Sequence, residues 1–344
     1  MTPTLLTNDH PALRAMWHPV CQEPASGEVS GGELFAQRYA VASVGGRALV
    51  AVDSCPHRGA RLSAGTIHDD GCLRCPYHGW RFGADGTCVA IPATGSVPIA
   101  ARANLTVVPS HTALGLVWIR GDHSDGVFAA IESPEWEALA KDGSGIAAAW
   151  LPDTTINSSA SQFIDNFLDV AHFPVVHAGT FGADEADEVG DLVVEPLGDD
   201  GIRLRYAHTV VNREDPLVES GEHPLIQPRV MEYTVRAPFQ ARLRIELPLT
   251  GVENTIVVVA SPTSARRTTL FTVMLRNDLG PDGAGGQHAI DYEMAVLAED
   301  LIVLENLADA GMPLEVPAQV HTRADRFTVE YRRMLARLVD ATLG

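Results

Sequence analysis

The sequence contains a single lysine, Lys141, and only five cysteines in 344 residues. Five cysteines are too few for a disulfide framework in a chain of this length. The longest strongly apolar runs, such as residues 256–260, have the length of a strand and not the roughly 20 residues of a membrane helix. Residues 1–10 carry neither a basic stretch nor an apolar run, so a secretory signal is not expected. We therefore expect a soluble, cytoplasmic protein without a membrane partner.

Basic residues are also scarce relative to acidic ones. Lysine and arginine total 25, aspartate and glutamate total 44, and the formal net charge is −19. This balance argues against nucleic acid and against anionic lipid as partners. The apolar share of 46% is ordinary for a globular protein. The length predicts two domains, which we place at residues 1–130 and 131–344.

The first third of the chain has a β pattern. Residues 34–44 and 47–52 form strand-like runs around Gly45-Gly46, which is a hairpin turn signal. Residues 105–108 and 114–119 are expected to form two more strands. A helix is expected to begin with Ser133 as N-cap and Pro134 at the first helical position.

The rest of the chain alternates between strand-like and helical patterns, which predicts an α+β protein with an antiparallel sheet. The expected strands are residues 193–196, 202–211, 230–235, 241–247, 255–260 and 268–275. The expected helices are residues 161–170, 288–309 and 325–343, and the expected loops are an acidic one at 184–191 and a glycine-rich one at 280–286.

Two short Cys–His pairs, Cys55-Pro-His57 and Cys75-Pro-Tyr-His78, are the most informative motif. Two cysteines and two histidines can bind zinc, or a [2Fe–2S] cluster in which two histidines replace two cysteines on one iron. Zinc fingers place both cysteines first and both histidines later, at wider spacing. Here each segment supplies one thiolate and one imidazole, which favours a two-iron cluster over zinc.

The segments around these pairs resemble the Rieske domain of Rieske non-haem iron oxygenases, in Cys55-Pro-His-Arg-Gly-Ala-Arg-Leu-Ser and Cys75-Pro-Tyr-His-Gly-Trp. The resemblance implies an N-terminal all-β domain that holds a [2Fe–2S] cluster through the two pairs. It also implies a catalytic domain with a helix-grip-like antiparallel sheet and a long C-terminal helix. It extends to the chain's end, Asp325-Arg-Phe through Leu335, which looks like the vanillate-demethylase-like, single-subunit-type branch.

A second constellation follows in Asp169-x2-His172-x4-His177. Asp169 and His172 share a helical face, whereas His172 and His177 are roughly 140° apart on an ideal helix. Pro174 lies between the histidines and must bend or interrupt the helix, which could direct both imidazoles to one point. By themselves these histidines could equally be ordinary core or cap residues.

The carboxylate that would complete a metal site is expected on the helix at 288–309. Asp300 lies at the edge of its apolar stripe, where an ionised carboxylate is costly without a partner such as a metal. Glu293 shares this face and is the rival, while Glu299 is expected to point away. The segment Glu299-Asp300 to Glu305 resembles the late acidic motif of the same oxygenase family, which favours Asp300.

The resemblance implies roles for these residues. His172, His177 and Asp300 would hold a mononuclear Fe(II) that leaves positions open for O2. Asp169 would link His78 of one subunit to His172 of the next and carry electrons between them, which requires a ring such as a homotrimer. The alternative for Asp169 is a plain surface carboxylate. Asn166 and Phe163 are candidate pocket residues and could as well be core.

The implied function is that of a terminal oxygenase. It would use O2 and electrons from an NAD(P)H-dependent reductase, with or without a ferredoxin, to hydroxylate or oxidatively demethylate a small aromatic or cyclic substrate. The alternatives are a cis-dihydroxylating dioxygenase and, in another class, a non-catalytic Rieske electron-transfer protein. Four arginines around the cluster motifs form a candidate docking patch for an acidic ferredoxin: Arg58, Arg61, Arg74 and Arg81.

Overall fold

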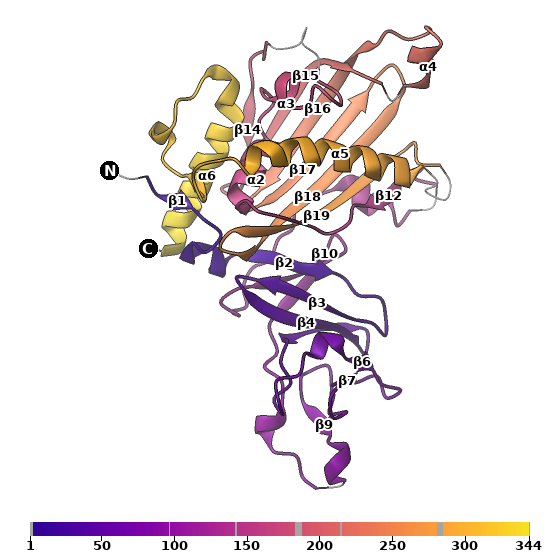
Figure 1. The fold of residues 1–344 in the computed structure, drawn as a ribbon, viewed down its shortest axis with the longest axis vertical. Coiled ribbons are helices and arrows are strands. Elements are labelled where there is room, and N and C mark those ends of the chain that lie inside the picture. Colours follow the sequence, from indigo (N-terminus) through magenta and orange to yellow (C-terminus); the bar gives the residue numbers. More distant parts are fainter. Residues whose placement is uncertain are drawn as a thin grey trace. The chain divides into compact units, whose positions relative to one another are not determined.

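The computed structural model describes residues 3–95, 97–141, 143–182, 188–213, 215–280 and 285–343. Its contacts divide the chain into two compact units, coloured by sequence in Figure 1. The smaller unit contains Asp9–Ala129 and Ser261–Ala265; the larger contains the residues up to Asn8, Ala130–Ala260 and those from Arg266 onward. Since each unit combines separate stretches of chain, the simple division at residue 130 stays a prediction.

The smaller unit is built from short antiparallel strands in three sheets. The sheet orders are β10-β11-β2, β3-β4-β5 and β6-β7-β8-β9. The strands are β2 (Trp17–Gln22), β3 (Val29–Leu34), β4 (Gln37–Val44), β5 (Arg47–Val52), β6 (Thr66–Ile67), β7 (Leu73–Arg74), β8 (Arg81–Phe82), β9 (Cys88–Ala90), β10 (Ser110–Ala113) and β11 (Leu116–Arg120). Short 3-10 helices connect them: η1 (Pro11–Ala15), η2 (Leu62–Ala64), η3 (Pro92–Thr94) and η4 (Ala101–Ala103).

The hairpin expected at Gly45-Gly46 is confirmed. Val44 pairs with Arg47, and both glycines of the two-residue turn have positive φ, +57° and +76°. The strand expected at residues 105–108 is wrong, because this segment makes only one isolated bridge, between Ala51 and Val107, instead of a ladder. The first expected strand corresponds to β4, and its first residue, Leu34, instead ends β3 ahead of the turn between the two strands.

An eight-stranded antiparallel sheet dominates the described part of the larger unit, in the order β12-β19-β18-β17-β16-β15-β14 with β13 beside β19. Its strands are β12 (Ala147–Trp150), β13 (Thr154–Ile156), β14 (Val194–Pro196), β15 (Gly201–Val211), β16 (Ile226–Arg236), β17 (Gln240–Leu247), β18 (Val252–Ser264) and β19 (Arg267–Arg276). β1 (Leu5–Leu6) pairs separately with β20 (Met312–Pro313). All six strands expected in this half of the sequence are present.

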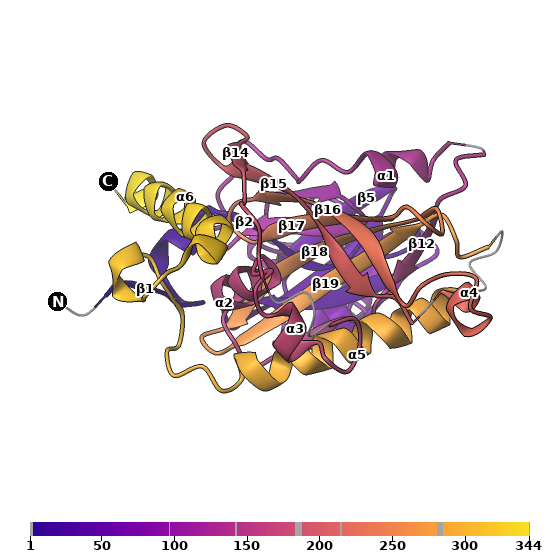
Figure 2. The same ribbon diagram turned by 90° about the horizontal axis from the view of Figure 1, so that it is seen from above.

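Helices lie around this sheet, and the long α5 (Gly286–Leu304) runs across one of its faces (Figure 1 and Figure 2). The others are α1 (Pro134–Ala138), α2 (Ala160–Phe167), α3 (Phe173–Val176), α4 (Pro216–Glu219) and α6 (Arg326–Leu343), with η6 (Val316–Ala318) and η7 (Arg323–Asp325). The expected start of α1 is confirmed, because the Ser133 side chain accepts a hydrogen bond from the Trp136 N–H and Pro134 follows it.

Other boundaries differ from expectation. α2 ends at Phe167 and α5 at Leu304, each a few residues before its expected end. The expected loops at 184–191 and 280–286 each lie partly outside the described residues, at 184–187 and 281–284. No helix among the described residues is both long enough and apolar enough to cross a membrane.

Candidate metal centres and the adjoining cavity

The two Cys–His motifs form two loops with the same backbone hydrogen bonds. In the first loop the Cys55 N–H donates to the Ala60 carbonyl, and the Gly59 N–H donates to the Cys55 carbonyl, both at 2.8 Å. The second loop repeats both bonds from Cys75, at 2.8 and 3.2 Å. Each bond pair closes a tight turn, so the two cysteines are held in equivalent surroundings although the histidines follow at different spacing.

A glycine with positive φ makes each of these turns possible. Gly59 and Gly79 both have φ of +68°, a backbone conformation that other residues adopt at a cost. Both lie four residues after the cysteine of their loop. The repeated glycine therefore belongs to the motif as much as the cysteine and histidine do.

The cysteine side chains of the two loops are buried together, whereas the histidine side chains are exposed. Cys55 and Cys75 are buried in the core of the smaller unit, and their sulfur atoms interact. Burial raises the pKa of the Cys55 thiol to about 11, and the neighbouring Cys75 adds to this effect, while the backbone hydrogen bond from His57 opposes it. The exposed His57 and His78 have ring centroids 4.4 Å apart, and Trp80 stacks on His57. Two buried sulfurs beside two exposed imidazoles fit a cluster with cysteines on one iron and histidines on the other.

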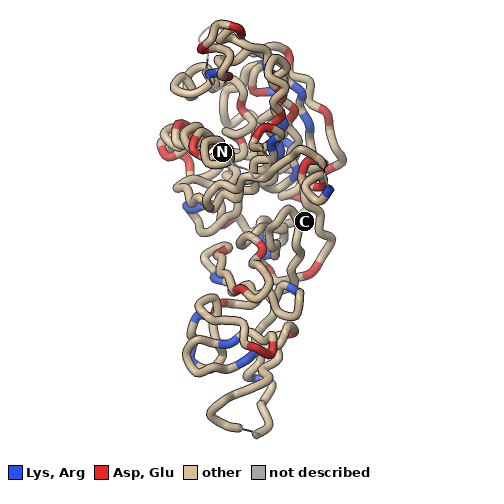
Figure 3. The backbone as a smooth tube through the Cα atoms, turned by 90° about the vertical axis from the view of Figure 1, so that its right-hand side faces the viewer, with Lys and Arg blue, Asp and Glu red and all other residues tan. Residues whose placement is uncertain are grey.

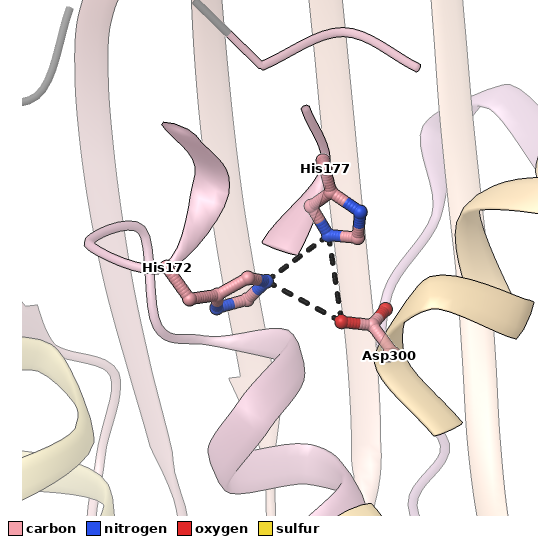
Figure 4. A group of neighbouring side chains, drawn as sticks. All are labelled: His172, His177 and Asp300. Carbon is pink, nitrogen blue, oxygen red and sulfur yellow. Dashed lines mark hydrogen bonds and ion pairs between the residues drawn. The ribbon is translucent and has the colours of Figure 1, made fainter. Parts of the chain in front are cut away.

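The larger unit brings His172, His177 and Asp300 together, as Figure 4 shows. The helix is interrupted at residues 168–172, between α2 and α3, and not between the histidines as expected, because Pro174 lies in the first turn of α3, where a proline is tolerated. His172 immediately precedes α3 and His177 immediately follows it. The two Nε2 atoms are 3.1 Å apart, and each lies 3.4 Å from Asp300 Oδ1 on α5.

These three atoms fit a metal ion. Bonds of about 2.1 Å place neighbouring ligands about 3.0 Å apart at right angles and about 3.4 Å apart at the tetrahedral angle. The three separations in the structure fall in this range. Two imidazoles and one carboxylate on the same side of a metal leave other positions open, which is the donor set of non-haem Fe(II) sites.

Charge at the site favours a cation. Burial lowers the pKa of His172, but the Asp169 and Asp300 carboxylates outweigh it and raise the value to about 9. Burial raises the pKa of Asp300, but His172 and His177 outweigh it and hold the value well below the ordinary range. The Asp300 carboxylate is therefore ionised at neutral pH and is stabilised by positive charge on the histidines, a role that a metal cation would also fill.

Glu299 belongs to the site as well, contrary to the expectation that it points away. Its Oε2 accepts a hydrogen bond from His177 Nδ1 at 2.9 Å and another from the Thr180 hydroxyl at 2.8 Å. The partner on Nδ1 fixes the tautomer of His177 and leaves Nε2 free to bind a metal. Adjacent residues of α5 thus contact the same histidine at its two nitrogens.

Asp169 and Asn166 lie next to two of the three candidate ligands, His172 and Asp300 respectively. Asp169 Oδ1 accepts the Ala171 N–H, and its Oδ2 lies 3.8 Å from His172 Nδ1. Asn166 donates to Asp300 Oδ1 at 2.9 Å. Asn166 therefore orients a candidate ligand and is absent from the lining of the adjoining cavity, whereas Phe163 lies in that lining.

A cavity of about 130 Å³ opens between α5, the α2–α3 region and the sheet, and His172, His177 and Asp300 form part of its wall. Most of the remaining wall is apolar, including Leu151, Phe167, Met231, Leu243, Ile256 and Val258. Glu293, the rival considered for Asp300, lines it too. Burial first, and then Asp300, raise the pKa of Glu293 to about 7. A mainly apolar cavity with a few polar groups is typical of a site for a small organic molecule.

Comparison with known protein families agrees with this architecture. A Rieske [2Fe–2S] domain matches residues 16–103, and the vanillate O-demethylase oxygenase C-terminal domain matches residues 156–341. Among curated proteins, methylxanthine N1-demethylase NdmA of Pseudomonas putida is 27% identical and aligns with 99% of this chain and 93% of its own. Methylxanthine N3-demethylase NdmB of the same species is 26% identical, over 95% and 90%.

Solved structures show the same fold. NdmA of Pseudomonas putida CBB5 with caffeine superposes with a TM-score of 0.75 at 25% identity, over 97% of this chain and 93% of that one. Dicamba monooxygenase bound to dicamba has a TM-score of 0.70 at 21% identity, over 96% and 98%. Both comparisons cover the smaller and the larger unit, and they confirm the expected fold class.

The Rieske domain and the metal-binding geometry of the second unit together define a Rieske-type oxygenase. Because the second family match covers more than half of the sequence, the chain belongs to the vanillate O-demethylase oxygenase C-terminal domain family. The expectation of an oxygen-incorporating oxidoreductase with a Rieske cluster and a mononuclear iron is confirmed. The prediction of an oxygenase component that acts on a small molecule is confirmed as well. The comparisons favour neither of the two alternatives, a cis-dihydroxylating dioxygenase and a non-catalytic electron-transfer protein.

Proposed function

We propose that this protein removes an N- or O-bound methyl group from a small cyclic molecule by hydroxylating that methyl group. The observation that carries the proposal is the position of His172, His177 and Asp300 in the wall of a mainly apolar cavity. The relatives NdmA and NdmB, described as methylxanthine demethylases, support the class of reaction.

Two sets of residues would hold the metal centres. We assign the [2Fe–2S] cluster to the two Cys–His loops, with ligands Cys55, His57, Cys75 and His78. We assign the mononuclear iron to His172, His177 and Asp300. When bound, these groups would activate O2 with electrons delivered from an external reductase.

The protein's own side chains would orient the ligands and keep water out. Glu299 holds His177 through Nδ1, and Asn166 holds the Asp300 carboxylate. The apolar wall excludes bulk water from the reacting methyl group and limits side reactions. A methyl carbon in contact with this wall meets the metal ligands on one side only, which favours oxidation at one position.

The direct test combines metal content with product detection. Purified protein should contain three irons and two acid-labile sulfides per chain, and His172→Ala should lose one iron and keep the cluster absorbance. With a surrogate reductase, the parent protein should release formaldehyde from a methylated cyclic substrate and the variant should not. His223→Ala is the matched control, because His223 pairs with Asp215 outside the cavity lining. Turnover retained in His172→Ala would refute the assignment.

We further propose that Asp169 links His172 to His78 of the partner subunit in a homotrimer. In support, Asp169 lies 3.8 Å from the buried Nδ1 of His172, which has no hydrogen-bond partner among the described residues. Asp169→Asn should keep both metal centres and lose turnover, because a reduced cluster could no longer pass electrons to the iron. Light scattering that gives a monomer, or full turnover in the variant, would contradict this proposal.

The electron donor is proposed to be a cytoplasmic reductase, directly or through an acidic ferredoxin. Arg58, Arg61 and Arg74 are exposed near the cluster loops, whereas Arg81 already pairs with Asp70. Figure 3 shows basic positions close together in the lower part of the smaller unit. Arg58→Glu should slow cluster reduction, and raising the salt concentration should slow it in the parent protein. Reduction rates insensitive to both would count against docking at this patch.

A further inference from the structure

One buried ion pair joins the C-terminal helix α6 to α2. α6 lies against β14 and β15, the last two strands at one edge of the large sheet (Figure 2). Arg332, on α6, is 6% exposed. Its Nε and Nη2 donate to the two carboxylate oxygens of Asp165 on α2, at 3.1 and 2.5 Å. Its Nη1 donates to Gln319 Oε1 at 2.6 Å, so all three nitrogens of the guanidinium are engaged.

The part of α6 that carries Arg332 is itself fixed to the sheet. The hydroxyl of the neighbouring residue, Tyr331, is buried and donates to the Pro238 carbonyl at 2.9 Å. Phe327, earlier on the same helix, is also buried, and its ring centroid lies 5.6 Å from that of Tyr233 on β16. The guanidinium therefore projects from a firmly packed helix, and its position is set by the sheet.

The residues that follow Asp165 contact the candidate metal ligands. The Nδ2 of Asn166, the next residue, donates to Asp300 Oδ1 at 2.9 Å. Asp169 follows just beyond the end of α2, and its Oδ2 lies 3.8 Å from His172 Nδ1. Consecutive residues point about 100° apart around a helix, so Asp165 and Asn166 hold α2 from two different directions. Together these two contacts set the rotation of α2 about its own axis.

The two halves of α2 are held in different ways. Its N-terminal half is fixed by buried hydrogen bonds, from Ser161 to the Leu6 carbonyl at 2.6 Å and from Gln162 to the Asp309 carbonyl at 2.9 Å. Its C-terminal half borders a groove of about 420 Å³. Because close packing does not fix this side of the helix, the orientation of the C-terminal half depends on polar contacts such as the pair with Arg332.

A buried ion pair supplies direction more than stability. Taking both charges out of water is costly, and an apolar pair of similar size often stabilises a protein as well or better. Burial accordingly raises the pKa of Asp165, and Arg332 opposes that shift. What the pair provides is geometry, because a planar guanidinium meets a carboxylate through two parallel hydrogen bonds at one distance and one angle. An apolar contact at the same place would let α2 slide or turn.

We propose that Arg332 is a positioning residue of the mononuclear iron site, acting through Asp165 on the orientation of α2. In this orientation Asn166 binds Asp300, and Asp169 lies next to the first histidine of the site. The inference rests on the iron site assigned under the proposed function. Arg332 is not one of the assigned ligands, so its loss should weaken iron binding by misplacing a ligand and not by removing one.

The test measures the Fe(II) affinity of the mononuclear site, by anaerobic competition with a chelator and independently of turnover. Arg332→Met should bind Fe(II) about tenfold more weakly, the lower end of the effect of groups that orient metal ligands. Arg332→Lys, which keeps the charge without the planar fork, should recover part of the affinity. Arg333→Met is the matched control and should bind like the parent, because Arg333 is exposed on the same helix and pairs with Glu330.

A double-mutant cycle shows whether Arg332 acts through α2. Asn166→Leu alone should also lower the affinity, because Asp300 loses its hydrogen bond. Adding Arg332→Met to Asn166→Leu should cause little further loss, since both substitutions act on the same carboxylate. Losses that simply add would mean that Arg332 affects the iron site by another route and would overturn the inference.

A second variant separates positioning from stability. Arg332→Met alone leaves the Asp165 carboxylate buried without its partner and should lower the melting temperature. Asp165→Leu combined with Arg332→Met replaces both partners with apolar side chains, so the melting temperature should recover while the iron affinity stays low. Recovery of both values together, or parent-like affinity in Arg332→Met, would overturn the inference and leave the iron site intact. A parent protein without the third iron would refute the assigned iron site, and this inference with it.

Discussion

His177 contacts two consecutive residues of α5 through its two ring nitrogens. Its Nδ1 lies 2.9 Å from Glu299 Oε2, and its Nε2 lies 3.4 Å from Asp300 Oδ1. The imidazole is buried, so its orientation depends on these two carboxylates more than on solvent. Glu299 therefore determines whether Nε2 is available and correctly directed, although it would not bind the metal itself.

Substituting Glu299 should weaken iron binding without removing a ligand. In Glu299→Gln the amide loses the negative charge that stabilises the His177 N–H, and we expect about 10- to 100-fold lower iron affinity. Competition with a chelator, followed spectroscopically on the reconstituted protein, gives this ratio. Glu305→Gln is the control, since Glu305 is exposed just beyond α5 and contacts Asn157 instead. An unchanged affinity in Glu299→Gln would show that the hydrogen bond has no such role.

The glycines of the cluster loops should be intolerant of a side chain. Gly79→Ala places a Cβ on a residue with φ of +68° and close to the Arg74 side chain. The strain costs about 1 kcal/mol or more and distorts the turn that holds Cys75, so cluster occupancy should fall. Gly71→Ala is the matched control because it has a similar φ, +77°, and open space around it. Visible absorbance and acid-labile sulfide per chain measure the difference; equal losses in both variants would contradict the prediction.

Stability should fall at acid pH through His208. Burial first, and then Arg229, lower the pKa of His208 from 6.5 to about 3. Between these two values the unfolded chain binds more protons than the folded one, so stability rises with pH and is lost as pH falls below about 6.5. The slope is at most about 1.4 kcal/mol per pH unit. Urea unfolding at pH 5 and at pH 7.5 should show a smaller difference in His208→Gln than in the parent protein.

Removing the mononuclear iron should destabilise the larger unit selectively. A cation bound by the two Nε2 atoms, which are 3.1 Å apart, and by the ionised Asp300 would hold the α2–α3 region to α5. A ligand that binds only the folded state stabilises it by about 2.7 kcal/mol at a hundred times its dissociation constant. Mild chelation should therefore lower the temperature of one calorimetric transition while the visible absorbance of the cluster persists. Iron loss without any thermal shift would argue against a bound metal at these residues.

The sequence was sufficient for the fold class and for residues that form compact motifs. The Cys–His pairs are close in the chain, so their loops could be recognised directly. Glu299 was missed because the helical wheel of α5 directs it away from the apolar stripe. In the structure the side chain reaches sideways to His177, past Gly179, which has no Cβ to obstruct the carboxylate. A contact between segments that are 122 residues apart leaves no periodic signal in either segment.

Arg229 illustrates the same limit. On β16 it lies on the same buried face as Met231 and Tyr233, and the sequence gives no sign that a charged residue at this position lacks a carboxylate partner. Only the register with β15 places it opposite His208, and only the folded chain brings the rings of Phe173 and Phe181 beside its guanidinium. The strand predicted at residues 105–108 is absent for a related reason. An extended, apolar segment becomes a strand only where a neighbouring strand continues the ladder of hydrogen bonds.

One helix, α5, carries both a part of the cavity wall and a candidate metal ligand. α5 presents Tyr292, Glu293, Val296 and Leu297 to the cavity and Asp300 to the histidines. A small rotation of this helix about its own axis therefore changes the shape of the cavity and the position of the carboxylate together. It follows that a bound molecule that displaced α5 would move the Asp300 carboxylate together with the apolar wall.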